Sequence, residues 1–255
     1  MRRGSAAAPA SPPNARRNMA TMKEPVKGSA KPLRDVLEET HWLQELPANA
    51  KERVYADAYE VFFNAGDVVV RKGDPGRAWL GVAEGLLKVS TVHRSGKVVM
   101  FTAIPEGSWI GEGAVIKREL LRYDIFAMRP SRVIHLPGAT FRWLLDTSIE
   151  FNHIVISRLN ERLSQYIAMV EIDRLTDPAA RVARAIGIMY NAVLHPRMGS
   201  VLTLSQTEMG ELIGMSRQSI SAALKQLESE GLVSTEYGGV MVRTVSSLIN
   251  YQERD

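Results

Sequence analysis

The segment 205–242 constrains the fold of this 255-residue chain more than any other part. Ser205 is followed three residues later by Glu208, which is the spacing of a capping box, where a hydroxyl and a carboxylate satisfy free amides at a helix start. Gly214 then allows a tight turn, and Ser216 is suited to cap a second helix. Two short helices joined by a turn of about three or four residues are typical of a helix-turn-helix.

A β-hairpin is expected directly after these helices. Gly231 is suited to end the second helix in a left-handed conformation, and the run 232–242 is divided by Gly238 and Gly239, a pair that favours a tight hairpin turn. Each helix has its apolar residues on one face. They are Met209, Leu212 and Ile213 in the first helix and Ile220, Leu224 and Leu227 in the second. The segment is therefore predicted to be a winged helix-turn-helix.

The second helix carries polar residues off its apolar stripe. Arg pairs with guanine and Gln with adenine at the major-groove edges of the bases, while hydroxyls and helix-start amides suit phosphate oxygens. The candidates for DNA contact are Ser205, Ser216, Arg217, Gln218, Ser219, Ser221 and Lys225. Arg217 and Gln218 standing alone would be ordinary solvated residues of a first helical turn. Their place in a winged helix-turn-helix favours contact with bases.

The positive charge of the chain is concentrated in its first 32 residues. The chain has 32 Lys and Arg against 28 Asp and Glu, a net charge of +4. Residues 1–32 contain seven basic residues and one acidic residue, so they carry +6 and residues 33–255 carry −2. Because residues 1–32 are rich in Pro and Ala, we expect a disordered basic tail, with a DNA- or membrane-binding arm as the alternative. DNA recognition must then depend on a few local contacts.

Composition also excludes several classes of protein. The chain has no cysteine, which excludes a disulfide scaffold, an iron–sulfur cluster held by thiolates and a cysteine-ligated zinc site. The sequence has no apolar run of the ~18–20 residues that cross a bilayer, and no membrane partner is expected. The N-terminus lacks the apolar core of a secretory signal, so a cytoplasmic protein is expected. None of the five histidines is placed as a metal ligand.

Residues 33–147 are expected to form a sensor domain. A helix is predicted over 33–46, where Pro47 ends it, and another over 139–145. Between them lie short β-rich runs separated by Gly- and Pro-containing turns, which favour a barrel or sandwich. These runs are 59–63, 68–70, 86–92, 98–104 and 133–136.

Residues 148–176 are predicted to form a long helix and a hinge. The steps between apolar positions alternate three and four, as in a coiled-coil seam. The dimer candidates on this seam are Ile149, Ile156, Leu159, Leu163, Tyr166 and Val170. A second apolar set is expected to pack on the barrel and consists of Phe151, Ile154, Val155 and Ile167. Burial of both sets favours a parallel dimer over a monomer with a long core helix. Asp177 and Pro178 then begin a helix predicted over 179–194, in an output domain spanning 177–250.

From about residue 33 to residue 251 the chain resembles the CRP/FNR family of bacterial transcription regulators. The resemblance rests on the motif at 208–217 and on Gly66, Gly73, Gly85 and Gly107. It implies an α+β fold with an N-terminal cyclic-nucleotide-binding-like jelly-roll barrel, a long dimerisation helix and a C-terminal winged helix-turn-helix. It also implies that Arg217 reads guanine. Gln218 and Ala222 stand where the catabolite activator protein has Glu and Arg as further base readers, so the operator half-site should differ.

The resemblance also points to an effector pocket after the Gly111–Glu112 pair. Glu112 and Arg122 match the residues that bind a ribose hydroxyl and a cyclic phosphate. Tyr123 stands where the family has a small hydroxyl, and Tyr166 stands near the base-reading position. Three interpretations stay open: a cyclic nucleotide in an altered pose, another ligand such as a cyclic dinucleotide or small anion, or a pocket kept only as fold. The alternative for Glu112 and Arg122 is a structural ion pair.

Together these patterns predict a ligand-responsive regulator that binds double-stranded DNA as a homodimer on a pseudo-palindromic operator. RNA polymerase is the expected partner if it activates transcription. The competing class is a nucleotide-binding scaffold whose helix-turn-helix docks protein, since residues 176–255 contain seven basic and eight acidic residues. An enzyme is not expected, because the sequence has no nucleophile elbow, phosphate-binding loop or His-Glu-x-x-His metal motif.

Overall fold

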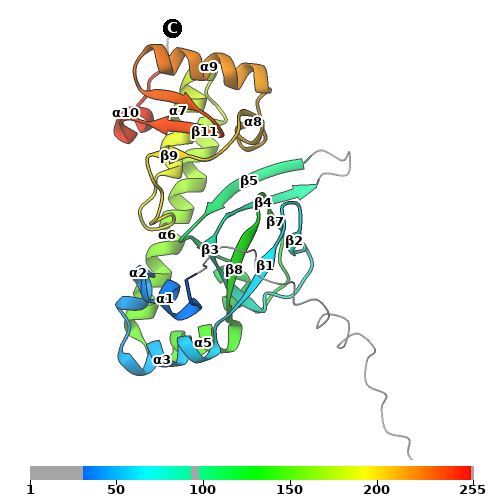
Figure 1. The fold of residues 1–255 in the computed structure, drawn as a ribbon, viewed down its shortest axis with the longest axis vertical. Coiled ribbons are helices and arrows are strands. Elements are labelled where there is room, and N and C mark those ends of the chain that lie inside the picture. Colours follow the sequence, from blue (N-terminus) through cyan, green and yellow to red (C-terminus); the bar gives the residue numbers. More distant parts are fainter. Residues whose placement is uncertain (1–30, 93–97, 254–255) are drawn as a thin grey trace, which may run out of the picture.

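A computed structural model describes residues 31–92 and 98–253 of the chain. The tail predicted to be disordered spans residues 1–32, of which residues 1–30 lie outside the described part. Figure 1 shows three layers along the long axis: a helical base, a β-sandwich, and an output domain at the opposite end. In the described ranges, no helix is long and apolar enough to span a bilayer.

The base is built from α1 (Leu33–Glu38), α2 (His41–Gln44), α3 (Ala48–Asp57) and α5 (Gly138–Thr147). The single helix predicted over 33–46 is wrong, because Thr40 is extended and its hydroxyl donates to the Val36 carbonyl at 3.1 Å. Helix α3 was not predicted. The core of the base is aromatic: Trp42, Trp79, Trp109, Phe141 and Phe151 lie in edge or tilted ring contacts.

The sensor strands form two four-stranded antiparallel sheets. The first, in order, contains β1 (Tyr59–Phe63), β8 (Ser131–Pro137), β3 (Ala78–Glu84) and β6 (Trp109–Ile110). The second contains β2 (Val68–Val70), β7 (Asp124–Ala127), β4 (Leu86–Val92) and β5 (Val98–Pro105). Leu80 and Val133 from the first sheet pack with Leu87 and Ile125 from the second in one core. The jelly-roll prediction is therefore confirmed, with two separate sheets in place of a closed barrel; β3, β6 and β7 were not predicted.

Helix α6 (Ile149–Ile172) is the long helix expected from the sequence. Ser148 caps it by accepting from the Phe151 amide at 3.2 Å. Phe151, Ile154 and Val155 are buried in the aromatic core, as predicted. Ile167 does not pack on the sandwich and is 62% exposed, because it lies on the seam side of the helix.

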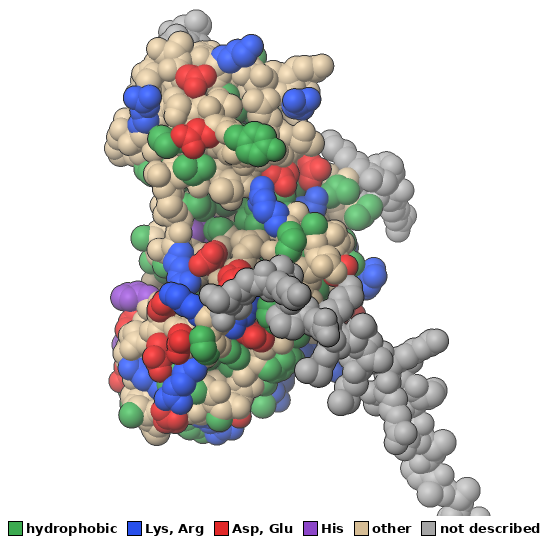
Figure 2. All heavy atoms as spheres, in the orientation of Figure 1, with side chains coloured by type: hydrophobic (Ala, Val, Ile, Leu, Met, Phe, Trp, Pro, Cys, Tyr) green, Lys and Arg blue, Asp and Glu red, His purple; other side chains and the backbone are tan. Residues whose placement is uncertain are grey.

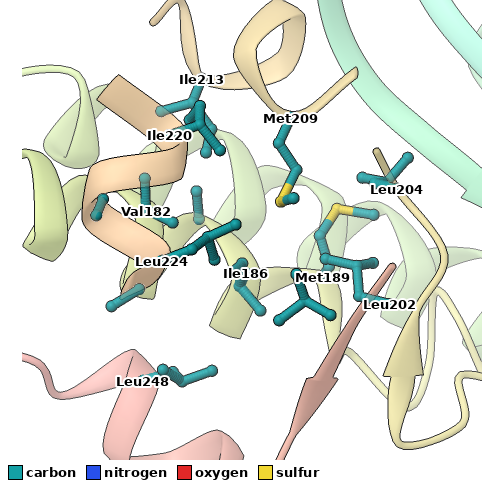
Figure 3. Packing of buried hydrophobic residues seen from close by; sticks show 14 of the residues in the cluster. Val182, Ile186, Met189, Leu202, Leu204, Met209, Ile213, Ile220, Leu224 and Leu248 are labelled. Carbon is teal, nitrogen blue, oxygen red and sulfur yellow. The ribbon is translucent and has the colours of Figure 1, made fainter. Parts of the chain in front are cut away.

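The output domain is a three-helix core with a small sheet. It contains α7 (Pro178–Met189), β9 (Val201–Leu202), α8 (Gln206–Ile213), α9 (Arg217–Ser229), β10 (Val233–Glu236), β11 (Gly239–Val242) and α10 (Val245–Ile249). Figure 3 shows side chains of α7, α8 and α9 converging in its core. Asp177 caps α7 as predicted, with its carboxylate accepting from the Ala179 amide. The prediction that this helix runs to 194 is wrong, because the Asn191 side chain accepts from the amides of Val193 and Leu194 and forms a turn. Strand β9 and helix α10 were not predicted.

The output domain packs against the second sensor sheet. Lys88 Nζ on β4 lies 2.9 Å from Glu211 Oε2 on α8, and Arg129 Nη2 lies 3.4 Å from Glu208 Oε2. Figure 2 shows basic and acidic side chains together at this boundary. Met100 of β5 shares one buried cluster with residues of α7 and α8. The first helix of the helix-turn-helix is thus held to the sensor by polar and apolar contacts.

Candidate DNA interface and effector pocket

The two helices of the helix-turn-helix begin at the caps that the sequence predicts. The Ser205 hydroxyl accepts from the Glu208 amide at 3.2 Å, and the Glu208 carboxylate accepts from the Ser205 amide at 2.7 Å, so the capping box is complete. Ser216 caps α9 by accepting from the Ser219 amide at 3.1 Å. Both helix starts are therefore held by side chains close to them in sequence.

The turn between α8 and α9 depends on two glycines. Gly214 has φ +75°, a backbone conformation that favours glycine. Gly210 lies where an added Cβ would stand 2.6 Å from the Met215 carbonyl oxygen, so only a residue without a side chain fits. Gly214 was expected at this turn from the sequence, whereas the role of Gly210 was not predicted. The sequence feature that could have predicted this role is the spacing of Gly210, four residues before Gly214.

Helix α9 buries one face and leaves the other to solvent. Ile220, Ala223, Leu224 and Leu227 are buried in the output core. The polar candidates of α9 lie off that face: Ser216, Arg217, Gln218 and Lys225 are exposed, and Ser219 and Ser221 are half-buried. Ser205, at the start of α8, is exposed as well.

The long side chains on the outer face of α9 have no partner within the part of the chain that the structure describes. Arg217, Gln218 and Lys225 make no hydrogen bond or ion pair there, so all three can reach a ligand outside the protein. On the face seen in Figure 2, the basic side chains of the output domain are scattered and form no broad patch. Any nucleic acid would therefore be bound through a few defined contacts.

The seam of α6 is an exposed apolar stripe in a single chain. Its exposed members are Ile149, Ile156, Leu159, Leu163, Tyr166, Ile167 and Val170, with Ile149 exposed by 71%. The helix buries its opposite side within its own chain. A stripe of large apolar side chains of this length is typical of a protein interface.

The effector-pocket candidates lie in two different environments. Gly111, with φ +101°, precedes α4 (Glu112–Lys117), and Glu112 is 3% exposed. Arg162 Nε donates to Glu112 Oε1 at 3.1 Å, and Trp79 Nε1 donates to Glu112 Oε2 at 3.2 Å. Both carboxylate oxygens of Glu112 therefore already accept from protein donors.

Arg122 lies at the surface, away from that pair. Its side chain is 77% exposed, and Nη2 lies 3.4 Å from Glu119 Oε2. The structure therefore does not bring Arg122 to Glu112. Arg122 pairs with Glu119, and Glu112 pairs with Arg162.

Two phenols lie near the Glu112–Arg162 pair. Burial, with the negative charge of Glu112 as a smaller cause, raises the pKa of Tyr123 to about 12. Burial also raises the pKa of Tyr166. The Tyr123 ring packs against the core between the two sensor sheets. Both phenols are protonated at neutral pH, so each can donate a hydrogen bond.

Residues that sequence reasoning missed complete this network. Arg158 on α6 donates to the Trp109 carbonyl at 3.0 Å and to the Val193 carbonyl at 2.8 Å, and burial lowers its pKa to about 10. His195 Nδ1 lies 2.8 Å from the Ser108 hydroxyl. The available signal was the placement of Arg158 and Arg162 four residues apart on the side of the helix that otherwise carries apolar residues.

Known proteins match both halves of the chain. Residues 60–148 match the family model of the cyclic nucleotide-binding domain, and residues 180–251 match that of the Crp-like helix-turn-helix domain. The chain belongs to the CRP/FNR family of transcription regulators. The cAMP-activated global transcriptional regulator CRP of Pasteurella multocida is 23% identical over 178 residues, which are 68% of this chain and 85% of that protein.

Two solved CRP/FNR structures have the same fold. FixK2 from Bradyrhizobium japonicum matches with a TM-score of 0.65 at 14% identity, covering 78% of this chain and 98% of that one. The c-di-GMP responsive global regulator CLP of Xanthomonas campestris matches with a TM-score of 0.56 at 19% identity, covering 78% of this chain and all of that one (100%). At this identity the likeness establishes the fold and leaves the effector open.

Proposed function

We propose that two copies of this chain associate through the α6 seam and regulate transcription by placing two α9 helices in successive major grooves of a pseudo-palindromic DNA site. The observation that carries the proposal is the outer face of α9, where Arg217, Gln218 and Lys225 extend into solvent without a partner in the described chain. Arg217 pairs with guanine, Gln218 faces a neighbouring base, and Lys225 meets a phosphate. The protein binds this DNA site in the cytoplasm. RNA polymerase is the further partner if the bound dimer activates transcription.

Selection of bound sequences from random duplex DNA tests this function. The wild-type chain should enrich a two-fold motif with the same half-site on each side, and Arg217→Ala should lose it. Arg71→Ala is the matched control, because Arg71 is an exposed arginine on the sensor domain. If neither the wild-type chain nor the control enriches any motif, with or without nucleotides, α9 does not read DNA and a protein-docking role takes its place.

We propose further that the effector carries a phosphate, as in a cyclic nucleotide or cyclic dinucleotide, and that it contacts Arg122 and Tyr123 in a pose unlike the one that the family resemblance implies. Glu112 is 3% exposed and accepts hydrogen bonds from Arg162 and Trp79, so little of its carboxylate is open to a ribose hydroxyl. Arg122 is exposed and shares only the surface carboxylate of Glu119, so it can turn to a phosphate.

Thermal-shift measurements with cyclic AMP, cyclic GMP and cyclic di-GMP test the effector assignment. A ligand at 100 times its dissociation constant stabilises the folded chain by about 2.7 kcal/mol, so one of the three should raise the midpoint clearly. Arg122→Ala should abolish that shift, and Arg71→Ala should retain it. A shift that is equal in the wild-type chain and Arg122→Ala contradicts the phosphate role of Arg122.

A further inference from the structure

Helix α8 carries two carboxylates whose charges are balanced by the sensor domain. Glu208 Oε2 lies 3.4 Å from Arg129 Nη2, and Glu211 Oε2 lies 2.9 Å from Lys88 Nζ. Arg129 belongs to the turn between β7 and β8, and Lys88 belongs to β4. Within the described chain, no Lys or Arg of the output domain pairs with either acid. The first helix of the helix-turn-helix therefore takes both of its balancing cations from another domain.

Glu208 lies at the start of α8, beside a candidate contact for DNA phosphate. Its carboxylate accepts from the Ser205 amide at 2.7 Å, and Ser205 is exposed. Arg129 Nη2 also donates to the Thr203 carbonyl at 2.5 Å, two residues before Ser205. The guanidinium of Arg129 is thus bound at the start of α8 while Ser205 stays open to solvent.

The contact between the two domains leaves the candidate DNA face accessible. Arg217 and Lys225 on α9 are exposed in this arrangement, and so is Ser205. Apolar contacts also hold the domains together, because Leu86 and Met100 of the sensor share one buried cluster with residues of the output domain. DNA can therefore reach α8 and α9 in the docked arrangement, and removal of one ion pair leaves the apolar contacts in place.

An unpaired carboxylate at position 208 would oppose DNA binding. Residues 176–255 contain seven basic and eight acidic residues, so the output region has no excess of positive charge to compensate for it. A phosphate that contacts Ser205 lies within about 8 Å of the Glu208 carboxylate, which is the Debye length at physiological salt. Repulsion between the two anions is then only partly screened. The positive charge of Arg129 cancels it.

We propose that Arg129 of the sensor domain is required for full DNA affinity, because it neutralises Glu208 beside the phosphate that Ser205 contacts. Arg129 acts through Glu208 and does not itself touch DNA. The inference rests on the proposed DNA-binding function and adds that the sensor completes the charge of the DNA interface. An output domain displaced from the sensor exposes an unpaired Glu208 and binds DNA more weakly, so the docked arrangement is the DNA-binding one.

Fluorescence anisotropy with the full chain and its selected operator tests the proposal through three variants that change charge. Arg129→Gln leaves Glu208 unpaired and should weaken binding by the dimer about tenfold, or about threefold for each half-site, as expected for like charges several Å apart in water. Glu208→Gln should tighten binding by a similar factor, and glutamine at this position still completes the capping box. The double variant Arg129→Gln, Glu208→Gln should bind like wild type, because the local charge is again zero.

Lys88→Gln is the matched control. It breaks the shorter of the two ion pairs at the same boundary, but Glu211 lies three residues further along α8, about 4.5 Å from Glu208 along the helix axis. This variant should therefore weaken binding less than Arg129→Gln does. Added salt should narrow the gap between wild type and Arg129→Gln, because it screens the repulsion that the variant introduces. A circular-dichroism melt checks that each variant is folded.

A role of the ion pair in docking alone predicts a different order of affinities. All three variants would then bind more weakly than wild type, and Lys88→Gln would bind no better than Arg129→Gln; either result overturns the proposal. Unchanged or tighter binding by Arg129→Gln overturns it as well. Failure of the proposed function has another signature, since the wild-type chain then enriches no DNA motif or Arg217→Ala binds the operator like wild type.

Discussion

The outer face of α9 and the Glu112 pocket are built in opposite ways. On α9, the side chains of Arg217, Gln218 and Lys225 extend into solvent with no partner in the described chain. In the pocket, Glu112 is buried and both its oxygens accept from protein donors. The α9 face is thus ready to take up an external ligand, whereas Glu112 already takes part in the internal structure of the sensor. The two regions should therefore respond differently to the same kind of substitution.

The largest expected effect is on stability, in the pocket. Glu112→Ala leaves the guanidinium of Arg162 buried without its carboxylate, and breaking a buried ion pair in this way costs about 3–5 kcal/mol. The free energy of unfolding from urea titration measures the loss. The double variant Glu112→Leu, Arg162→Leu should recover only part of it, because it removes the Arg162 charge and leaves Trp79 Nε1 without its acceptor. Arg122→Ala, at the surface, should change stability by less than about 0.5 kcal/mol. Equal effects of Glu112→Ala and Arg122→Ala would contradict the contrast between them.

The next effect is the pH dependence of His195, which lies in the loop after α7 and contacts Ser108 of the sensor domain. Burial, with repulsion from Arg162 and Arg158 as smaller causes, lowers the pKa of His195 to about 3 from 6.5. The unfolded chain therefore takes up this proton below about pH 6.5 while the folded chain does not. The stability that His195 contributes is complete above that pH and falls by about 1.4 kcal/mol per pH unit below it.

His195→Gln isolates this contribution. Urea titrations at about pH 7, 6 and 5 should show a shallower loss of stability for His195→Gln than for wild type. The variant should keep a part of the slope, because burial also lowers the pKa of His135, to about 4. Identical slopes in the two proteins would show that His195 is protonated in the folded chain.

The smallest effect concerns the start of α9. Ser216→Ala removes the hydroxyl that accepts from the Ser219 amide, and loss of such a cap costs about 1 kcal/mol. Ser221→Ala is the matched control, since Ser221 is a half-buried serine inside the same helix. Chemical denaturation should show a loss for the first variant and almost none for the second. A loss of the same size in both would mean that the cap contributes nothing specific.

The helix-turn-helix could be predicted from the sequence, whereas the contacts of Glu112 could not. The α8–α9 unit depends on residues close together in the chain, such as Ser205 with Glu208 and Gly214 at the turn, so local spacing was sufficient. The hydrogen-bond partners of Glu112 are Arg162 and Trp79, which lie 50 and 33 residues away in the sequence. No local pattern predicts such pairs, because they form only when α6 packs on the sensor.

The errors in secondary structure have a different origin, in local breaks of the helices. The break between α1 and α2 depends on the extended backbone of Thr40, and the early end of α7 depends on the Asn191 side chain. The apolar periodicity of the sequence continues past Thr40 and past the end of α7, so it indicates neither the break nor the helix end. Ile167 was assigned to the sensor although it lies on the seam face of the helix, where a second chain is the natural partner.

The most direct test of the central claim is a coupling measurement between Arg217 and one base of the selected operator. The binding free energies of wild type and Arg217→Ala are compared on the operator and on a copy whose guanine, at the same position of each half-site, is replaced by adenine. We predict that wild type prefers guanine by about 1–3 kcal/mol per half-site and that Arg217→Ala shows no preference there, with unchanged stability. If Arg217→Ala keeps the full preference for guanine, Arg217 does not read that base and the assignment of α9 as the recognition helix is contradicted.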